Sequence, residues 1–546
     1  MPCGTCVRYE YQCEYSTGKR ASIVQNGDIN PEPPGPAPIG STKPNIIQLQ
    51  AHPLTAPGAR FHHRSILDPT KTRFVRANSA IAFPRILGMD LESETIPRLH
   101  SFAWHLGIRR EPAEGFEQID MLLIWPDMQR LAKTYFKYVK PEIGLLEEAD
   151  FMEQISARYQ SPQGYNDFDA VALGVANLGS FFSPNPHPRE EDFMLNAYKI
   201  LTHQSMARSP TSNNVAGWIL RTIYLRLTSR PHAAWMSSSV TMHQVEACGL
   251  HKEMQTIAVV YPAAPTGDHK SAKTRRRLFW IAKALNIIFS FEYGRSRINF
   301  DVVTTKKFAA DSGGFSHQFV ELADLLPNDF VDREREPDPP AALSSALTRI
   351  EEMQSESAFI TMLKADLAFA IYRRLWLMSL TDAKDRAETV IGLGKAAMLA
   401  VEKTFEARVP WWNVVACPFQ FVCVALAVGT PKSLAQVPEI LNLLHRVAIA
   451  YDTHMVKEAF NQASALVRMA RMRKERELEA LHNVADLPPI QDHPSVTSTG
   501  LQEAPNLDWV SDLPFEWDVF LNPDLVMSSQ QGQSAVDASF GSQLGF

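Results

Sequence analysis

The chain has 546 residues, a net charge of −6 at neutral pH and a hydrophobic fraction of 45%. These values allow a large buried core, and they exclude a protein whose whole surface is basic for binding nucleic acid. At roughly 150 residues per domain, the length fits three or four domains or one large body with tails. The N-terminus has no apolar signal segment, so we expect a reducing compartment inside the cell.

Residues 1–20 contain three closely spaced cysteines, Cys3, Cys6 and Cys13. Two cysteines separated by two residues can hold one zinc ion from a turn, and the third adds another tetrahedral ligand. The segment is too short and polar to form a core, so only a metal could fold it. The spacing therefore predicts a zinc site that these three thiolates leave incomplete. The alternative is an unstructured tail that happens to contain cysteines.

Residues 21–80 are rich in proline up to about residue 58 and basic after it. Little in this stretch could form a core, so we predict a disordered linker. No heptad pattern runs through the proline-rich part, which leaves a homodimer possible but unsupported.

Residues 81–480 have the hydrophobic periodicity of consecutive amphipathic helices, and strand signals are scarce. We therefore predict an all-α fold with one large helical body. The small residues of 168–182 suit close helix packing. The longest apolar run, 409–428, is interrupted by Asn413, Pro418 and Gln420, which favours a buried helix over a membrane span. The clearest predicted helices are 116–138, 168–182, 193–207, 215–230, 234–249, 358–380 and 383–407, and 435–479 is predicted to form one or two more.

The stretch 273–301 is the centre of the predicted body. Its apolar residues recur at helical spacing, and flanking aromatic residues make the helix apolar over much of its circumference. Gly294 is expected to end the helix. The basic run Arg275–Arg277 near its start could be an import signal, but we expect these side chains to pair with acids of the body. The predicted stripe is Leu278, Ile281, Leu285 and Ile288.

Residues 485–546 contain no lysine or arginine, and the segment 507–521 interleaves four acids with four aromatic residues. This composition is typical of a disordered activation segment whose aromatic residues become buried as a short helix in a partner's groove. The alternative is a C-terminal helix docked on the body. The predicted partner-binding residues are Trp509, Phe515, Trp517 and Phe520.

No catalytic motif appears. There is no glycine-rich phosphate loop with the required spacing, no His-Glu-x-x-His and no Gly-x-Ser-x-Gly, so we predict that the chain is not an enzyme. His243, Cys248 and His251 lie close in sequence, but their spacing favours roles in the core over metal binding.

The N-terminal motif Pro-Cys3-x2-Cys6-x6-Cys13-Glu-Tyr resembles the second half of the fungal binuclear zinc-cluster (Zn2Cys6) DNA-binding domain. In that family, six cysteines hold two zinc ions. The resemblance implies that Cys3 matches a cysteine that bridges both metals. The first half, which supplies the family's main base contacts, is not seen before Cys3. We expect either a misassigned start or a product without specific DNA binding.

The body resembles the helical middle homology region of the same regulators. The matching pieces are spread along the chain: Tyr135-Phe136, the Arg-Pro-His-Ala-Ala-Trp of 230–235, the Gly-Leu-His of 249–251 and the Arg-Arg-Arg-Leu-Phe-Trp of 275–280 with its Gly-Arg turn. Two residues depart from the family pattern. Asn286 stands where Asp is usual, and Ser296 follows the Gly-Arg turn where Pro is usual.

The resemblance implies a nuclear fungal transcription regulator of RNA polymerase II genes, with zinc as its metal. Its implied partners are DNA, coactivators bound by the tail and a small-molecule effector bound by the body. One alternative is an all-helical metabolite-binding protein or enzyme with an incidental cysteine tail. Another is a natural inhibitor that competes for partners without touching DNA. The sequence does not indicate the target genes, the effector, or whether the output is activation or repression.

Overall fold

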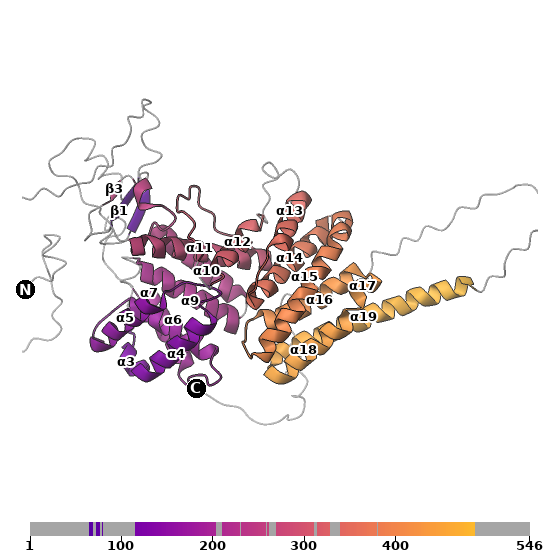
Figure 1. Cartoon of the computed structure of the whole chain (residues 1–546), viewed down its shortest axis with the longest axis horizontal. Helices are drawn as coiled ribbons and strands as arrows, with labels where there is room; N and C mark the ends of the chain where they lie inside the picture. Colours follow the sequence, from indigo (N-terminus) through magenta and orange to yellow (C-terminus); the bar gives the residue numbers. More distant parts are fainter. Residues whose placement is uncertain are drawn as a thin grey trace, which may run out of the picture. The chain divides into compact units, whose positions relative to one another are not determined.

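The computed structural model describes residues 65–68, 73–76, 79 and 115–485, apart from 204–209, 230, 258, 261–268, 311–313, 328–338 and 379. This part of the chain is mostly helical, as the sequence periodicity predicts (Figure 1). The α-helices are α3 (Ile119–Leu122), α4 (Trp125–Tyr138), α5 (Glu148–Gln160), α6 (Phe168–Phe181), α7 (Glu190–Thr202), α9 (Ser212–Thr228), α10 (Pro231–Ala247), α11 (His269–Tyr293), α12 (Ser316–Leu325), α13 (Pro339–Glu352), α14 (Ala358–Met378), α15 (Leu380–Glu406), α16 (Asn413–Val428), α17 (Pro431–Leu434), α18 (Val437–Tyr451) and α19 (His454–Ala485).

Helix α6 is the centre of the first group of helices, because α4, α7 and α9 all pack against it. Two glycines allow its neighbours to approach closely. A methyl group on Gly174 would lie 2.9 Å from Cβ of Leu220, and one on Gly179 would lie 2.0 Å from the carbonyl oxygen of Leu131. The prediction that the small residues of this segment permit close packing is therefore confirmed.

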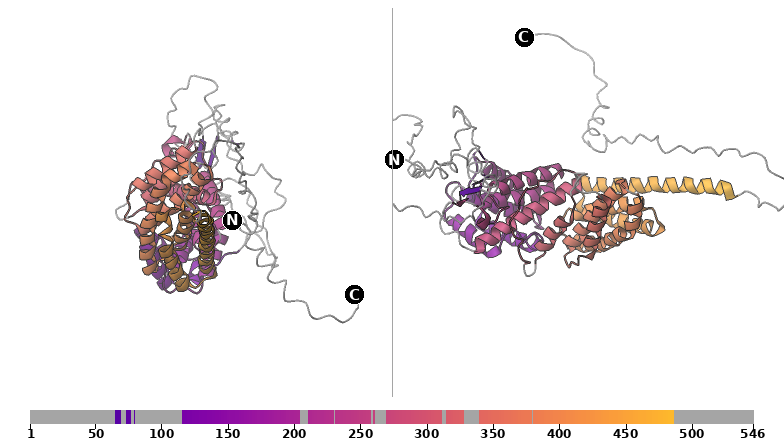
Figure 2. Two further views of the ribbon diagram at one scale, coloured as in Figure 1. Left: turned by 90° about the vertical axis from the view of Figure 1, so that its right-hand side faces the viewer. Right: turned by 90° about the horizontal axis from the view of Figure 1, so that it is seen from above.

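Helices α11 and α12 connect this group to a second group built around α14, which packs against α13, α15 and α16 (Figure 2). The long apolar run forms α16, and both α15 and α18 also contact it. This agrees with the prediction of a buried helix. In the part of the chain that the structure describes, no helix is both long and apolar enough to cross a membrane.

The polar residue Asn413, which interrupts the apolar run, has a partner in the core. Its amide donates to Oδ2 of Asp366 on α14 at 2.5 Å, and the thiol of Cys417 donates to Oδ1 of the same carboxylate at 2.9 Å. Burial raises the pKa of Asp366 to about 7. The cluster joins α14 to α16 by hydrogen bonds, and Arg373 on α14 adds another by donating to Gln420 on α16.

Three short strands form a small sheet in the order β2–β1–β3. β1 (Ser65–Asp68) pairs antiparallel with β2 (Arg73–Arg76), and its other edge pairs in parallel with β3 (Val259–Val260). The prediction of a disordered linker over 21–80 is therefore wrong for the residues of β1 and β2. The sequence did not predict these strands, because four-residue strands give almost no periodic signal.

Contacts between β2 and the helical body explain why this short sheet forms. Phe74 is buried, packs edge-on against the ring of His251, and lies above Gly249, whose φ of +65° favours glycine. Arg76 donates to Glu246 and to Asp301 at 3.0 and 2.9 Å. These tertiary contacts stabilise strands that the local sequence alone does not favour.

One predicted helix also needed correction. The single helix predicted over 116–138 is two helices, α3 and α4. Leu123 and Ile124 have extended backbones between them, and Pro126 in the first turn of α4 has no N–H with which to continue α3. The segment predicted over 435–479 as one or two helices forms two, α18 and α19, so that prediction is confirmed; α19 ends at Ala485.

We expect Gly179→Ala to lower the free energy of unfolding by at least the roughly 1–3 kcal/mol of an overpacked core. The new methyl group would meet backbone atoms of α4, which cannot rotate away as a side chain can. Gly392→Ala on α15 is the matched control, because a methyl group there meets nothing within 4 Å. Urea unfolding of the full chain measures both. Similar free energies for the two variants would contradict the close contact.

Candidate functional site

Helix α11 contacts several of the segments that stood out in the sequence. Its predicted apolar stripe is confirmed, because all four of its residues are at most 1% exposed. The helix also buries polar groups, which need partners inside the protein. The stripe residues are Leu278, Ile281, Leu285 and Ile288.

Two arginines at the start of α11 bind the chain that follows α10. Arg276 donates twice to the carboxylate of Glu253, from Nε at 2.6 Å and from Nη2 at 3.2 Å. Arg275 donates to the carbonyl oxygen of Gly249 at 3.0 Å. The Arg276 guanidinium holds the pKa of Glu253 below its usual value. These bonds attach α11 to residues 249–253, the Gly-Leu-His segment and the acid after it.

A third arginine, Arg277, binds on the other side of α11, to the residue that precedes α5. Arg277 is only 2% exposed and donates to Oε1 of Glu147 at 2.8 Å, and Lys273 donates to the same oxygen at 3.0 Å. Burial would raise the pKa of Glu147, but Lys273 and Arg277 together hold it below its usual value. The expectation that Arg276 and Arg277 pair with acids of the body is confirmed. Arg275 differs, because it binds a carbonyl.

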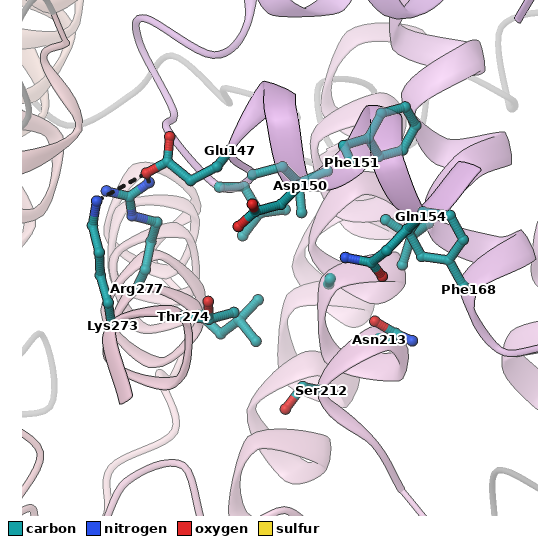
Figure 3. A pocket seen from close by; sticks show the side chains of 15 residues that line it. Glu147, Asp150, Phe151, Gln154, Phe168, Ser212, Asn213, Lys273, Thr274 and Arg277 are labelled. Atoms are coloured by element: carbon teal, nitrogen blue, oxygen red, sulfur yellow. Dashed lines mark hydrogen bonds and ion pairs between the residues drawn. The ribbon is translucent and has the colours of Figure 1, made fainter. Parts of the chain in front are cut away.

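Beside this ion pair lies a pocket between the start of α5, α6, the start of α9 and α11 (Figure 3). Its volume is about 100 Å³. The side with Glu147, Lys273 and Arg277 is charged, while Gln154 and Asn213 lie across from it (Figure 3). Asp150, Ser212 and Thr274 also line the pocket, and the rest of the lining is apolar. The apolar residues are Leu145, Leu146, Phe151, Phe168, Val171, Ala216 and Leu278.

The small volume limits what this pocket can hold. An engineered apolar cavity of about 150 Å³ binds benzene, so this pocket has room for a group smaller than an aromatic ring or for a few waters. Drug-sized ligands need pockets of roughly 300 Å³ or more. The pocket of Figure 3 is therefore a site for a small polar group rather than for a whole metabolite.

After α11 the chain turns and runs back along the helix as an extended segment of residues 294–303, which we call the strap. Gly294 has a φ of +61° and ends α11, as predicted, and the N–H of Arg295 donates to the carbonyl of Ser290 at 2.8 Å. Asn286 is fully buried and accepts from the N–H of Ile298 at 2.8 Å. Its amide also donates to Oγ of Ser238 on α10 at 3.0 Å.

The strap also contacts the Arg-Pro-His-Ala-Ala-Trp segment at the start of α10. The indole of Trp235 donates to the carbonyl of Ser296 at 3.1 Å, and the guanidinium of Arg295 lies 4.8 Å from the centre of the same indole. Arg295 is also 3.0 Å from Nδ1 of His232. Two segments that are separated by sixty residues in sequence therefore meet at one place.

The residues that we selected for zinc and partner binding, namely Cys3, Cys6, Cys13, Trp509, Phe515, Trp517 and Phe520, all lie outside the described residues. Within the described ones, no cluster of three or more histidines, cysteines and acids could hold a metal. Burial raises the pKa of Cys248 to about 12 and lowers the pKa of His251 to about 4. Both side chains are neutral parts of the core, as we expected, whereas His243 on α10 is exposed, so the expected core role is wrong for it.

Sequence reasoning did not identify Glu147 or Glu253, the acids that neutralise the arginines. Glu147 is followed by Glu148 and Asp150 at the start of α5, and Glu253 stands alone in a loop, so nothing in either local pattern distinguishes the residue from a solvated acid. The role of Asn286 was also missed. Its one signal was its position, which is in line with the apolar residues of α11 rather than on a polar face.

Comparison with known proteins gives a consistent result. Residues 132–393 match the model of the fungal specific transcription factor domain. The chain is 33% identical to Protein RDR1 of Saccharomyces cerevisiae over 96% of this chain and 92% of that protein. It is 32% identical to Transcription factor kojR of Aspergillus oryzae, over 95% and 91%. It is also 32% identical to Protein RDR1 of Gibberella zeae, over 96% and 93%. No solved structure matches the chain significantly.

We expect Asn286→Ala to lower the free energy of unfolding by about 1–3 kcal/mol, because it leaves the N–H of Ile298 without its acceptor. In the full-length variant, the rate of amide hydrogen exchange should increase more in the strap than in α14. Asn461→Ala on the exposed face of α19 is the control and should change stability by less than about 0.5 kcal/mol. Unchanged exchange in the strap would show that Asn286 does not hold it.

Proposed function

The chain belongs to the family of fungal transcription factors, and we propose that it acts in the nucleus as a regulator of RNA polymerase II genes, with DNA binding through a zinc cluster that is incomplete in this chain. The observation that carries this proposal is the match of residues 132–393 to the family domain, together with identity of 32–33% to relatives over more than nine-tenths of their length. The family domain and the relative kojR are those of transcription factors and not of enzymes, which removes the enzyme alternative.

The zinc ligands in this proposal are Cys3, Cys6 and Cys13. Bound zinc would supply folding energy to a segment that has no core. The other cysteines are unsuited to the task. Cys248 and Cys417 are buried, and burial raises the pKa of Cys423 to about 11, so these thiols stay protonated and cannot act as thiolate ligands. The N-terminal cysteines alone supply three of the six thiolates of a binuclear cluster.

We expect the purified full chain to bind less than two zinc ions, and weakly, because three thiolates cannot complete two tetrahedral sites. Metal analysis after dialysis against a zinc buffer measures the stoichiometry. Cys6→Ser should abolish binding. Cys423→Ser is the matched control and should leave it unchanged. Tight binding of two zinc ions would show that this view of the site is wrong.

The second part of the proposal concerns residues 485–546. The segment 507–521 alternates acids with Trp509, Phe515, Trp517 and Phe520. Acids keep such aromatic residues in water until a partner's groove buries them, which is how short amphipathic activation helices bind. We assign this segment to coactivator binding. In this scheme, an effector bound to the helical body sets the activity of the tail.

We expect residues 485–546 to activate a reporter gene when they are fused to an unrelated DNA-binding domain. Replacing Trp509, Phe515 and Trp517 by alanine should reduce the activity at least tenfold, because each buried aromatic contributes roughly 1.5–3 kcal/mol to binding. Phe540→Ala lies outside the acidic segment and serves as the control. A fusion that is silent, or that stays active in the triple variant, would rule out this role.

A further inference from the structure

A buried polar cluster joins α14 to α16 in the second group of helices. It consists of Asp366 on α14 and of Asn413 and Cys417 on α16. Asp366 is 7% exposed, and the other two side chains are completely buried. A carboxyl group in such a place is costly to ionise, because burial removes the water that stabilises its charge. The protonation state of Asp366 is therefore decided by its neighbours in the protein.

The contacts of Cys417 need one hydrogen more than the thiol can supply. Its Sγ lies 2.9 Å from Oδ1 of Asp366 and 3.2 Å from the carbonyl oxygen of Met362. Both oxygens are acceptors when Asp366 is ionised, and a thiol has a single hydrogen to donate. If Asp366 is protonated, its O–H donates to Sγ, and the S–H donates to Met362. The amide of Asn413 donates to the other oxygen of Asp366 in either state. Protonation thus gives each of these three contacts its own hydrogen.

The surroundings of the cluster favour the same protonated state. Burial is the largest influence on Asp366 and raises its pKa to about 7, and the like charge of Glu292 on α11 adds to it. Arg226 on α9 acts in the other direction, but it donates to Glu292 at 2.7 Å and is thus already paired with a carboxylate. The titratable groups that act on Asp366 come from α9, α11, α14 and α16. They are Arg226, Glu292, Tyr293, Arg373 and Cys417.

We propose that Asp366, Asn413 and Cys417 form a proton-dependent switch that sets how firmly α14 and α16 pack together. With the proton bound, three hydrogen bonds join the two helices. When the proton leaves, the thiol can bond to only one of its two acceptors, and a negative charge remains in the core. The body then favours states in which the helices separate and water reaches the carboxylate. This regulation of the body by protons does not depend on the role that we propose for the tail.

The direction of the pH effect follows from the two states of the aspartate. In an unfolded or locally opened chain its pKa is about 3.9, whereas burial raises the pKa of Asp366 in the closed body to about 7. Between these values the closed body keeps a proton that the opened chain has lost. Opening therefore becomes more favourable as the pH rises through this range, by up to about tenfold per pH unit, and changes little above it.

Amide hydrogen exchange of the full chain tests the proposal at about pH 6 and pH 8, one unit on either side of the pKa of Asp366. Each rate is divided by the intrinsic rate of the same peptide at that pH. We expect α14 and α16 to open about tenfold more often at the higher pH. Asp366→Asn keeps the size of the side chain but cannot ionise, so its helices should open equally often at both. Asp385→Asn, on the exposed side of α15, is the matched control and should behave like the unaltered chain.

A second acid beside α14 has to be separated from the first. Burial raises the pKa of Glu142 to about 7 as well, and Glu142 accepts from Oγ of Ser357, just before α14, at 2.6 Å. In Glu142→Gln, the pH response of α16 should remain, because Glu142 is not part of the cluster. Loss of this response in Glu142→Gln, with its retention in Asp366→Asn, would assign the effect to Glu142 and overturn the proposal.

Infrared spectroscopy detects the proton itself, because the C=O band of a carboxylic acid is separate from the bands of a carboxylate. The difference spectrum between the unaltered chain and Asp366→Asn should contain this band at the lower pH, and the band should fade about tenfold at the higher pH. If Asp366→Asn does not fold, Asn413→Leu gives another test. The amide of Asn413 lowers the pKa of Asp366, so its loss should move the pH response of α16 to higher pH. Equal opening of the unaltered chain at both pH values, a response that persists in Asp366→Asn, or an unchanged response in Asn413→Leu would overturn the proposal.

Discussion

The burial of Arg277 at the start of α11 constrains how the first half of the body is assembled. A guanidinium that is taken out of water without a partner costs several kcal/mol, and the charge cannot be removed by deprotonation. Arg277 is almost completely buried, so the chain has to bring Glu147 to it. Arg276 is only partly buried, and its ion pair with Glu253 adds a second attachment. Together these bonds fix α11 against the entrance of α5 on one side and the exit of α10 on the other.

Neutral polar residues fix other interfaces, and their burial costs less desolvation free energy than that of a charged group. Asn286 uses its carbonyl and its amide on two different segments, the strap and α10. The family that the chain resembles usually has Asp at this position. A buried carboxylate could accept from Ile298, but it would carry a desolvation penalty that an amide avoids. Asn413 and Cys417 act similarly around Asp366, where two donors meet a carboxylate whose pKa burial raises to about 7.

Sequence patterns predicted the features that depend on neighbours along the chain. The helices, the apolar stripe of α11, the end of that helix at Gly294 and the close packing at Gly179 all follow from local spacing or residue size. Features that depend on distant residues could not be predicted this way. The strands β1 and β2 form because Phe74 and Arg76 find partners on α10 and near the strap. Glu147 is 130 residues from Arg277 and has no local signature.

The strap and α11 are held by different kinds of contact. Hydrogen bonds of Ile298 and Arg297 attach the strap, and Phe300 packs against the rings of His251 and Phe279. Helix α11 is held by a fully buried stripe and by ion pairs. Elements with few buried contacts open at the lowest free energy, so the strap opens more easily than α11.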